Sequence, residues 1–409
     1  MAELFDYQKQ LASAAKAIFK ARGIVYIAAE ERTGKTFVSL QMLHELGYER
    51  IFVVTKKAAI DGWLNVLNTH YPNVSHFVCN YQSLHKVSSE MMKHFDVVIV
   101  DEAHSNLGGF PKTSQTAARL QKLAYEKLCV FLSATPCAQT YASLFHQLNI
   151  CKHSPWDDYR NFYAWFKDYG IPKLIRGAGG RQIVAYDEIK GEMIEPIFKD
   201  YFVFLKRADS GEFEVEPVDE LCFITPKQST LDKIDEIRRK KILTNEIENC
   251  VIENISKEMH LLHSIESGAA KIDEWRSVEF DEIDEKINYI LARWGDSEDI
   301  AIFYEYIAEG ERLRKTFSKA RILQGTTYAE GVDLSHLKCA IVLSMNFSTA
   351  KYIQRRCRLC HPKRTAPIFI YYLLFKGHLS EAVYNCVAQK RQNFTESIYK
   401  TFRGRENDF

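Results

Sequence analysis

The sequence lacks any uninterrupted apolar run of the roughly 18 residues that a membrane-spanning helix needs. It also lacks a charge imbalance, because 54 basic and 53 acidic residues leave a formal net charge of +1. Its first residues, Met1–Asp6, lack the basic and apolar regions of a signal peptide. We therefore expect an intracellular, cytoplasmic protein with no membrane partner. The average charge does not exclude a nucleic-acid partner, since backbone binding needs only a local basic groove.

Paired cysteine motifs are also scarce. Cys357-x-x-Cys360-His361 is the one such pair among ten cysteines, and zinc needs four ligands, so we favour no metal there. Cys129 and Cys339 lie inside apolar runs, which is typical of reduced core residues and not of a disulfide framework.

What is present is a chain of 409 residues, too long for a single core and suited to two or three domains. Apolar strand-like runs alternate with amphipathic helical stretches over residues 1–150 and 298–400. That alternation predicts an α/β fold with two parallel sheets covered by helices. The expected strands are Gly23–Ala28, Ile51–Thr55, Ser75–Cys79, Val97–Val100, Cys129–Leu132, Ile300–Tyr304, Ala320–Gln324, Cys339–Ser344 and Ile368–Leu374.

Residues 149–297 differ from both blocks, and we expect a mostly helical insertion between lobes at 1–148 and 298–409. Apolar residues recur there at helical spacing, at Leu231, Ile234 and Ile237 and again at Ile247, Val251 and Ile255. Trp156 and Trp165 could stack on bases, but we favour packing of a helix onto its lobe. The basic run Arg238–Lys241 fits either a solvated helix face or a nucleic-acid contact.

A phosphate-binding loop is predicted where the first strand runs into Ala29–Thr36 and then a helix. Backbone N–H groups of such a loop, which includes Thr33 and Gly34, converge on phosphate oxygens. Lys35 would reach the β- and γ-phosphates of ATP, and the Thr36 hydroxyl would ligate Mg²⁺.

Two adjacent carboxylates follow the apolar strand Val97–Val100, at the edge where ligands of open α/β sheets bind. Asp101 is placed to hold Mg²⁺ through water, and Glu102 can orient and deprotonate an attacking water. A surface acidic pair capping a helix is the plainer alternative. Ser133-Ala134-Thr135 comes next, also at the end of an apolar strand.

These three elements, in this order, resemble motifs I, II and III of superfamily-two helicases, and Asp101–His104 resembles the DEAH form of motif II. Other segments resemble the Swi/Snf-type ATPases that translocate on duplex DNA. The resemblance implies two RecA-like lobes, with ATP and Mg²⁺ as cofactors and nucleic acid as partner. It also implies that alternating grip on the backbone converts hydrolysis into steps along a strand.

Further positions take their roles from the same resemblance. It implies that Gln8 recognises adenine and that motif V and VI residues contact the nucleotide, namely Gly331, Asp333 and the catalytic Arg358. It implies nucleic-acid contacts in motifs Ia, Ib and V, at Thr55, Lys56, Asn80, Tyr81 and Thr326.

Two departures from the family pattern stand out. The second motif VI arginine is replaced by His361, so Arg355, Arg356 or Arg364 substitutes for it, or hydrolysis is slow. The second lobe is short between its first two strands, as in compact viral members.

Three functions remain open: a translocase or helicase on duplex or branched DNA, which we favour, an RNA helicase, and a nucleotide-gated DNA-binding scaffold.

Overall fold

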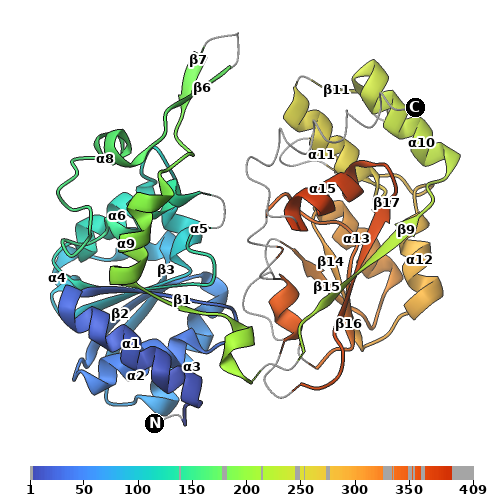
Figure 1. Cartoon of the computed structure of the whole chain (residues 1–409). Coiled ribbons are helices and arrows are strands. Elements are labelled where there is room, and N and C mark those ends of the chain that lie inside the picture. The colour runs from blue at the N-terminus through green and yellow to red at the C-terminus, as the bar shows by residue number, and fades with distance from the viewer. Residues whose placement is uncertain are drawn as a thin grey trace. The chain divides into compact units, whose positions relative to one another are not determined.

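The computed structural model contains two compact units, Met1–Glu212 and Phe213–Phe409 (Figure 1). It describes residues 3–137, 140–176, 182–212, 215–244, 249–252, 254–272, 277–325, 334, 336–348, 352, 355–360 and 364–388. Each unit is built around its own parallel sheet, which confirms the predicted α/β fold class with two parallel sheets.

The first unit contains a six-stranded parallel sheet in the order β3-β2-β4-β5-β1-β8. All five strands expected in this block are confirmed, with ends shifted by a residue at most. The inner strands β1, β2, β4 and β5 form because continuous apolar runs are buried on both faces of the sheet, whereas the edge strand β3 is partly exposed. The strands are β1 Ile24–Ala29, β2 Arg50–Thr55, β3 Ser75–Asn80, β4 Val97–Asp101, β5 Leu128–Ser133 and β8 Phe202–Leu205.

Helices cover both faces of this sheet, because alternate strand residues point to opposite sides. One core lies under α1–α3, and the other lies under α5–α9. The helices are α1 Asp6–Arg22, α2 Lys35–Glu45, α3 Ile60–His70, α4 Ser89–Met92, α5 Ala103–Leu107, α6 Gln115–Ala124, α7 Leu144–Leu148, α8 Phe162–Tyr169 and α9 Gly191–Tyr201. Short 3-10 helices are η1 Lys57–Ala59, η2 Tyr81–Lys86, η3 Tyr141–Ser143 and η5 Arg207–Ser210.

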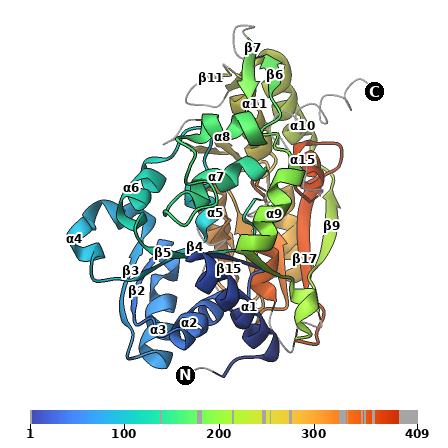
Figure 2. The same cartoon turned by 60° about the vertical axis from the view of Figure 1, so that its left-hand side comes forward.

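A two-stranded antiparallel hairpin, β6 Lys173–Arg176 and β7 Gln182–Ala185, extends away from this sheet beyond α8 (Figure 1; Figure 2). The aromatic segment before it is packed inside the unit. Trp156 and Trp165 are both 0% exposed, so their interpretation as packing residues is confirmed.

The second unit contains a five-stranded parallel sheet in the order β15-β14-β16-β17-β9. The four strands expected in this block are confirmed with small shifts at their ends. The sheet strands are β9 Val218–Ile224, β14 Ile300–Tyr304, β15 Arg321–Gln324, β16 Cys339–Val342 and β17 Phe369–Phe375. Two small antiparallel pairs accompany them, β10 Ile242–Thr244 with β11 Asn249–Val251 and β12 Ala269–Lys271 with β13 Ser277–Glu279.

Helices again pack on both faces, with α10, α11 and α15 on one core and α12 and α13 on the other. Their bounds are α10 Gln228–Asp235, α11 Ile255–Ile265, α12 Glu285–Trp294, α13 Ile307–Thr316 and α15 Leu379–Ala388, with short helices η6 Glu236–Lys240 and η7 Cys357–Leu359. Among the described residues, no helix combines the length and apolarity that crossing a membrane requires.

The expected separate insertion at 149–297 differs from the structure. Residues 149–212 belong to the first unit because β8 pairs with β1, and residues 213–297 belong to the second because β9 pairs with β17. The helical prediction holds at Ile234, which lies in α10, but not at Val251, which lies in β11. A new helix begins only at Ile255, where the Asn254 side chain accepts a hydrogen bond from the Lys257 N–H.

Candidate active site

The loop between β1 and α2 has the geometry of an anion-binding turn. Gly34, the residue before the helix, has φ +81°, and an added Cβ would collide with the Gln8 amide nitrogen. Only glycine combines that backbone conformation with that close approach. The first N–H groups of α2 have no partner within the helix and carry its positive dipole end. The local structure therefore presents several N–H donors to an anion.

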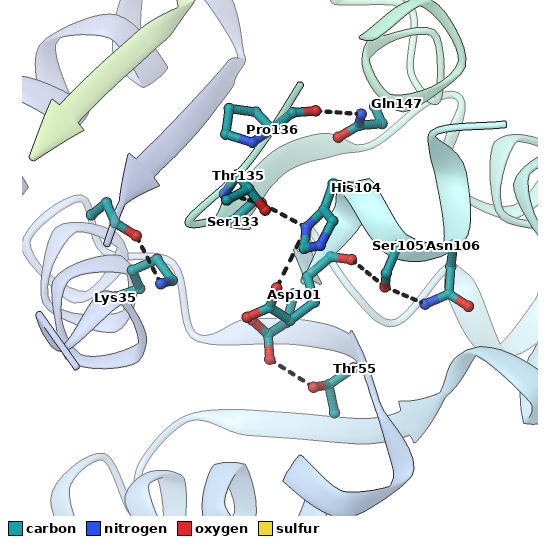
Figure 3. Close-up of polar contacts among 12 residues, drawn as sticks. Lys35, Thr55, Asp101, His104, Ser105, Asn106, Ser133, Thr135, Pro136 and Gln147 are labelled. Carbon is teal, nitrogen blue, oxygen red and sulfur yellow. Dashed lines mark hydrogen bonds and ion pairs between the residues drawn. The ribbon is translucent and has the colours of Figure 1, made fainter. Parts of the chain in front are cut away.

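Lys35 opens this helix, and its ammonium group lies over the loop. Its Nζ donates to the Ala29 carbonyl at 2.8 Å (Figure 3). It also donates to the Glu30 carbonyl at 3.3 Å. Thr33 is fully buried, and its hydroxyl donates to the Glu30 carbonyl at 2.7 Å. The side chain of Thr36 is partly exposed at the same helix end. Hydrogen bonds within the loop therefore hold its shape, and the Lys35 ammonium group lies against it.

Helix α1 braces the loop from outside. The Gln8 Nε2 donates to the Thr33 carbonyl at 3.0 Å, and the Tyr7 hydroxyl donates to the same carbonyl at 3.2 Å. The Gln8 Oε1 accepts from the Phe5 N–H at 3.1 Å. The structure therefore bonds both ends of the Gln8 amide to the protein, where the sequence resemblance implies adenine recognition. Its described contacts make it a clamp on the phosphate-binding loop.

Strand β8 braces the start of the loop. The Glu30 N–H donates to the Leu205 carbonyl at 3.0 Å, and the Glu30 carboxylate accepts from the Arg207 N–H at 2.9 Å. Arg207 is buried, and its guanidinium donates to the Glu31 carbonyl at 3.4 Å. Leu205 and Arg207, which the sequence pattern assigns to an insertion, therefore help to hold this loop in place.

Asp101 ends β4 at the carboxyl edge of the sheet, and its side chain is held by two donors. The Thr55 hydroxyl donates to Oδ2 at 2.7 Å (Figure 3). The Trp63 indole N–H also donates to Oδ2, at 2.9 Å. Burial raises the pKa of Asp101, and the neighbouring Glu102 raises it further, while these two donors and Lys35 lower it. One carboxylate oxygen, Oδ1, is left outside this pair of bonds.

Glu102 has φ 51° and ψ 43°, a left-handed conformation that is strained for a residue with a Cβ. Its side chain is 18% exposed, and its Oε2 lies 3.4 Å from His104 Nδ1. Burial lowers the pKa of His104 to about 3, and the Lys56 charge acts in the same direction, so this imidazole is neutral at neutral pH. The pair is therefore not a salt bridge.

Ser133, at the end of β5, contacts the His104 ring. The Ser133 Oγ accepts from the Thr135 N–H at 3.0 Å and lies 2.7 Å from His104 Nδ1. Because a hydroxyl oxygen can accept a second hydrogen bond as well as donate one, this contact fits either ring tautomer of His104. The Glu102 Oε2 is buried without a hydrogen-bond partner in the part of the chain that is described.

The donor set suits Mg²⁺ bound together with phosphates. Mg²⁺ prefers oxygen ligands and is commonly held by one or two carboxylates plus substrate phosphates. Asp101 and Thr36 offer a carboxylate and a hydroxyl beside Lys35. No group of three or more His, Cys, Asp or Glu side chains able to hold a metal occurs among the described residues. The protein alone supplies too few ligands here, so the phosphates would have to complete the shell.

The residues predicted to touch nucleic acid separate into two kinds. Thr55 and Tyr81 are buried, and the Tyr81 hydroxyl donates to the Asp101 carbonyl at 2.5 Å. Both hydroxyls bond Asp101, and the expected contact of these two positions with nucleic acid stays a prediction. Asn80 is partly exposed, but its Oδ1 caps η2 by accepting from the Ser83 N–H at 2.8 Å. Lys56 is partly exposed.

Most of the residues predicted in motifs V and VI lie outside the described residues. These are Thr326, Gly331, Asp333 and His361, and the side chain of Arg358 is likewise not described.

The three arginines considered as substitutes for His361 do lie in the described part. Arg356 donates to Asp219 Oδ1 and to the Pro217 carbonyl, and Arg364 donates to the Leu337 carbonyl at 3.0 Å. Arg355 is 1% exposed and lies over the Phe303 ring, 5.3 Å from its centroid. Burial lowers the pKa of Arg355, whose Nε and Nη1 have no hydrogen-bond partner among described residues. Arg356 and Arg364 thus bind their own unit.

Trp63, His104 and Arg207 were not predicted as site residues. A signal for His104 and Ser133 exists in the sequence, since His104 lies four residues after the expected strand Val97–Val100 and Ser133 directly follows Cys129–Leu132. Neighbouring parallel strands bring such residues to one edge. Trp63 and Arg207 reach the site through α3 and β8, whose packing no local pattern reveals.

Residues 1–138 match the model of the family described as type III restriction enzyme, res subunit, and this stretch contains Lys35, Asp101 and Glu102. No curated protein sequence matches the chain. Among solved structures, it is similar to the Sulfolobus solfataricus SWI2/SNF2 ATPase core in complex with dsDNA, at 14% identity and a TM-score of 0.45, covering 99% of this chain and 95% of that one. It is also similar to the S. solfataricus SWI2/SNF2 ATPase core domain, at 14% identity and a TM-score of 0.44, covering 97% of this chain and 90% of that one.

Proposed function

We propose that this chain hydrolyses ATP and couples hydrolysis to movement on nucleic acid, with duplex or branched DNA as its substrate. The observation that carries the proposal is the meeting of Lys35, Asp101 and Glu102 at the edge of the first sheet. The positive charge of Lys35 lowers the pKa of Asp101, which supports placing the cation and the first carboxylate in one site.

Phosphate binding falls to the loop and the start of α2. The N–H donors after Gly34 bind phosphate oxygens, and Lys35 exchanges its backbone carbonyls for the β- and γ-phosphates. Thr36 and Asp101 would hold Mg²⁺, which neutralises phosphate charge when bound. Thr55 and Trp63 hold the Asp101 side chain in place by donating to Oδ2, and both donors lower its pKa.

Water activation falls to Glu102. A general base must have a free oxygen within reach of the attacking water. The Glu102 Oε2, which has no hydrogen-bond partner among the described residues, supports this role.

The nucleic-acid substrate is supported by the order of motifs along the chain and by the family match over residues 1–138. The Swi/Snf-like character of those motifs favours DNA over RNA. Backbone contacts to phosphates would make tracking largely independent of base sequence.

The test is steady-state ATP turnover by the purified chain, alone and with duplex DNA, forked DNA, single-stranded DNA or RNA at matched nucleotide concentration. Duplex or forked DNA is expected to give the largest stimulation. Stimulation by RNA alone would replace the proposal with an RNA-directed motor. ATP binding without turnover under any condition would leave a nucleotide-gated binding protein instead.

A further inference from the structure

A cavity of about 450 Å³ lies at the amino end of β1, at the opposite edge of the first sheet from the phosphate-binding loop. Its walls are the end of α1 at Phe19–Gly23, the turn after α2 at Leu46 and Tyr48, and the segments at Leu128 and His153. Sites for small molecules measure roughly 300–1,000 Å³. The length of β1, on the order of 20 Å, separates this α1-end cavity from the loop, so its ligand is not the nucleotide bound there.

The end of α1 supplies hydrogen-bond acceptors to the α1-end cavity. A helix leaves its last four carbonyl groups without partners inside the helix, and they carry the negative end of its dipole. The Phe19 carbonyl accepts from the Gly23 N–H at 2.8 Å. The carbonyls of Lys20 and Ala21, two residues that line the cavity, accept no hydrogen bond from any described residue beyond the helix. A ligand with N–H donors would satisfy them.

The His153 ring supplies a second polar wall. Gly23 ends α1 with φ +73°, and a Cβ added to it would lie 2.6 Å from the His153 Nδ1. This close packing restricts the ring, and neither of its nitrogens has a hydrogen-bond partner in the described part of the chain. Burial lowers the pKa of His153, so at neutral pH its neutral ring offers a ligand one donor and one acceptor.

An aromatic wall and a single cation define the rest of the ligand. Phe19 and Tyr48 meet edge to face with ring centroids 5.8 Å apart, and both line the cavity, so a planar ring can lie against Tyr48. Of the lysine and arginine that line it, Arg22 is already paired with Asp200 at 2.7 Å. Lys20 forms no ion pair with a described residue. The cavity can therefore match one negative charge.

A nucleoside monophosphate combines these properties. Its base is planar, the amino groups of adenine, guanine and cytosine donate N–H bonds, and its single phosphate carries the negative charge. We propose that the α1-end cavity binds a nucleoside monophosphate, with the amino group of the base at the carbonyls that end α1, the ring of the base against Tyr48 and the phosphate at Lys20. This binding is separate from ATP hydrolysis and does not depend on it.

The test is isothermal titration calorimetry on the full chain with Lys35→Ala, which weakens nucleotide binding at the candidate active site. AMP, GMP, CMP and UMP are compared with adenosine, which has no phosphate. Two cavity variants are made in the same background, Lys20→Gln and His153→Phe, the second of which keeps a planar ring and loses its nitrogens. Lys122→Gln is the matched control, because Lys122 is an exposed lysine in the last turn of α6, as Lys20 is in α1, and lies outside the cavity. Circular dichroism and thermal melting check that each variant is folded.

One hydrogen bond is worth roughly fivefold in affinity, so AMP, GMP and CMP should each bind about fivefold more tightly than UMP, whose base has no amino group. His153→Phe should weaken AMP binding by a similar factor. Lys20→Gln should weaken AMP binding and flatten its salt dependence, while leaving adenosine binding unchanged. Lys122→Gln should change none of these.

The proposal is overturned if none of these nucleotides binds, if UMP binds as tightly as AMP, or if both cavity variants bind AMP as their parent does. The assay measures binding without hydrolysis. Cavity-dependent AMP binding in a chain whose wild type hydrolyses no ATP would therefore reject the proposed ATPase and keep this site. ATP turnover by wild type without cavity-dependent AMP binding would reject the site and keep the ATPase.

Discussion

Thr55→Val tests whether the environment of Asp101 governs activity. It removes the hydroxyl that donates to Asp101 Oδ2 at 2.7 Å and keeps the branched shape of a fully buried side chain. A hydrogen bond to a charged group is worth about 1.5–3 kcal/mol. At a factor of ten per roughly 1.4 kcal/mol, turnover should fall roughly ten- to hundredfold where Asp101 must be ionised.

The pH dependence provides a second readout. Burial and Glu102 already raise the pKa of Asp101, and the Thr55 donor lowers it. Loss of that donor therefore raises the pKa further, so the rise of turnover with increasing pH should move to higher pH. Stability has the opposite sign. A carboxyl whose pKa is raised on folding contributes stability at low pH, and that contribution is lost as pH rises through the folded pKa. Thr55→Val should therefore be most destabilised, relative to wild type, on the alkaline side.

Thr55→Ser is the matched control, because it keeps the donor and loses only a buried methyl group. It should cost about 1 kcal/mol of stability, measured by urea denaturation, and leave the pH profile in place. The reasoning is refuted if Thr55→Val keeps both the turnover and the pH profile of wild type, or if Thr55→Ser shifts the profile as far as Thr55→Val does.

Three further outcomes are expected. Gly34→Ala should cost about 1–3 kcal/mol by urea denaturation and weaken ATP binding in fluorescence titration, because φ is +81° and the new methyl has no room; wild-type values for both would contradict the loop geometry. Arg358→Ala should abolish DNA-stimulated hydrolysis while His361→Arg keeps or raises it, since imidazole offers no fixed charge or bidentate fork; the reverse pattern in the same turnover assay would show that motif VI is misaligned. Neutralising Arg238–Lys240 to Gln should flatten the salt dependence of DNA binding, with Lys241 left intact because it pairs with Glu258 at 2.6 Å; an unchanged slope would show a solvated face.

The parallel strands were predictable because their runs are apolar on both faces, and Val97–Asp101 is a clear case. Phe202–Leu205 was not, because this short strand directly follows α9 without a turn signal. Val218–Ile224 was not either, because it is an edge strand interrupted by acidic residues and largely exposed on one side.

The candidate site likewise contains residues that the sequence predicts and residues whose contacts it does not predict. Lys35 and Asp101 follow from local spacing, since each directly follows an expected strand or its loop. The resemblance to motif Ia assigns Thr55 to nucleic acid, and nothing in the sequence reveals that β2 lies beside β4. That pairing places its hydroxyl on Asp101. Local patterns thus predict which residues end a strand, and strand order decides what those residues touch.

Glu102→Gln measured beside Lys35→Ala tests the central claim most directly. The glutamine variant removes only the basic oxygen, so it should bind ATP as wild type does and lose multiple-turnover hydrolysis. The alanine variant should instead lose ATP affinity, because it removes the Lys35 ammonium group from the loop. Unchanged turnover by purified, folded Glu102→Gln protein would contradict the assignment of this edge of the sheet as an ATP-hydrolysing site.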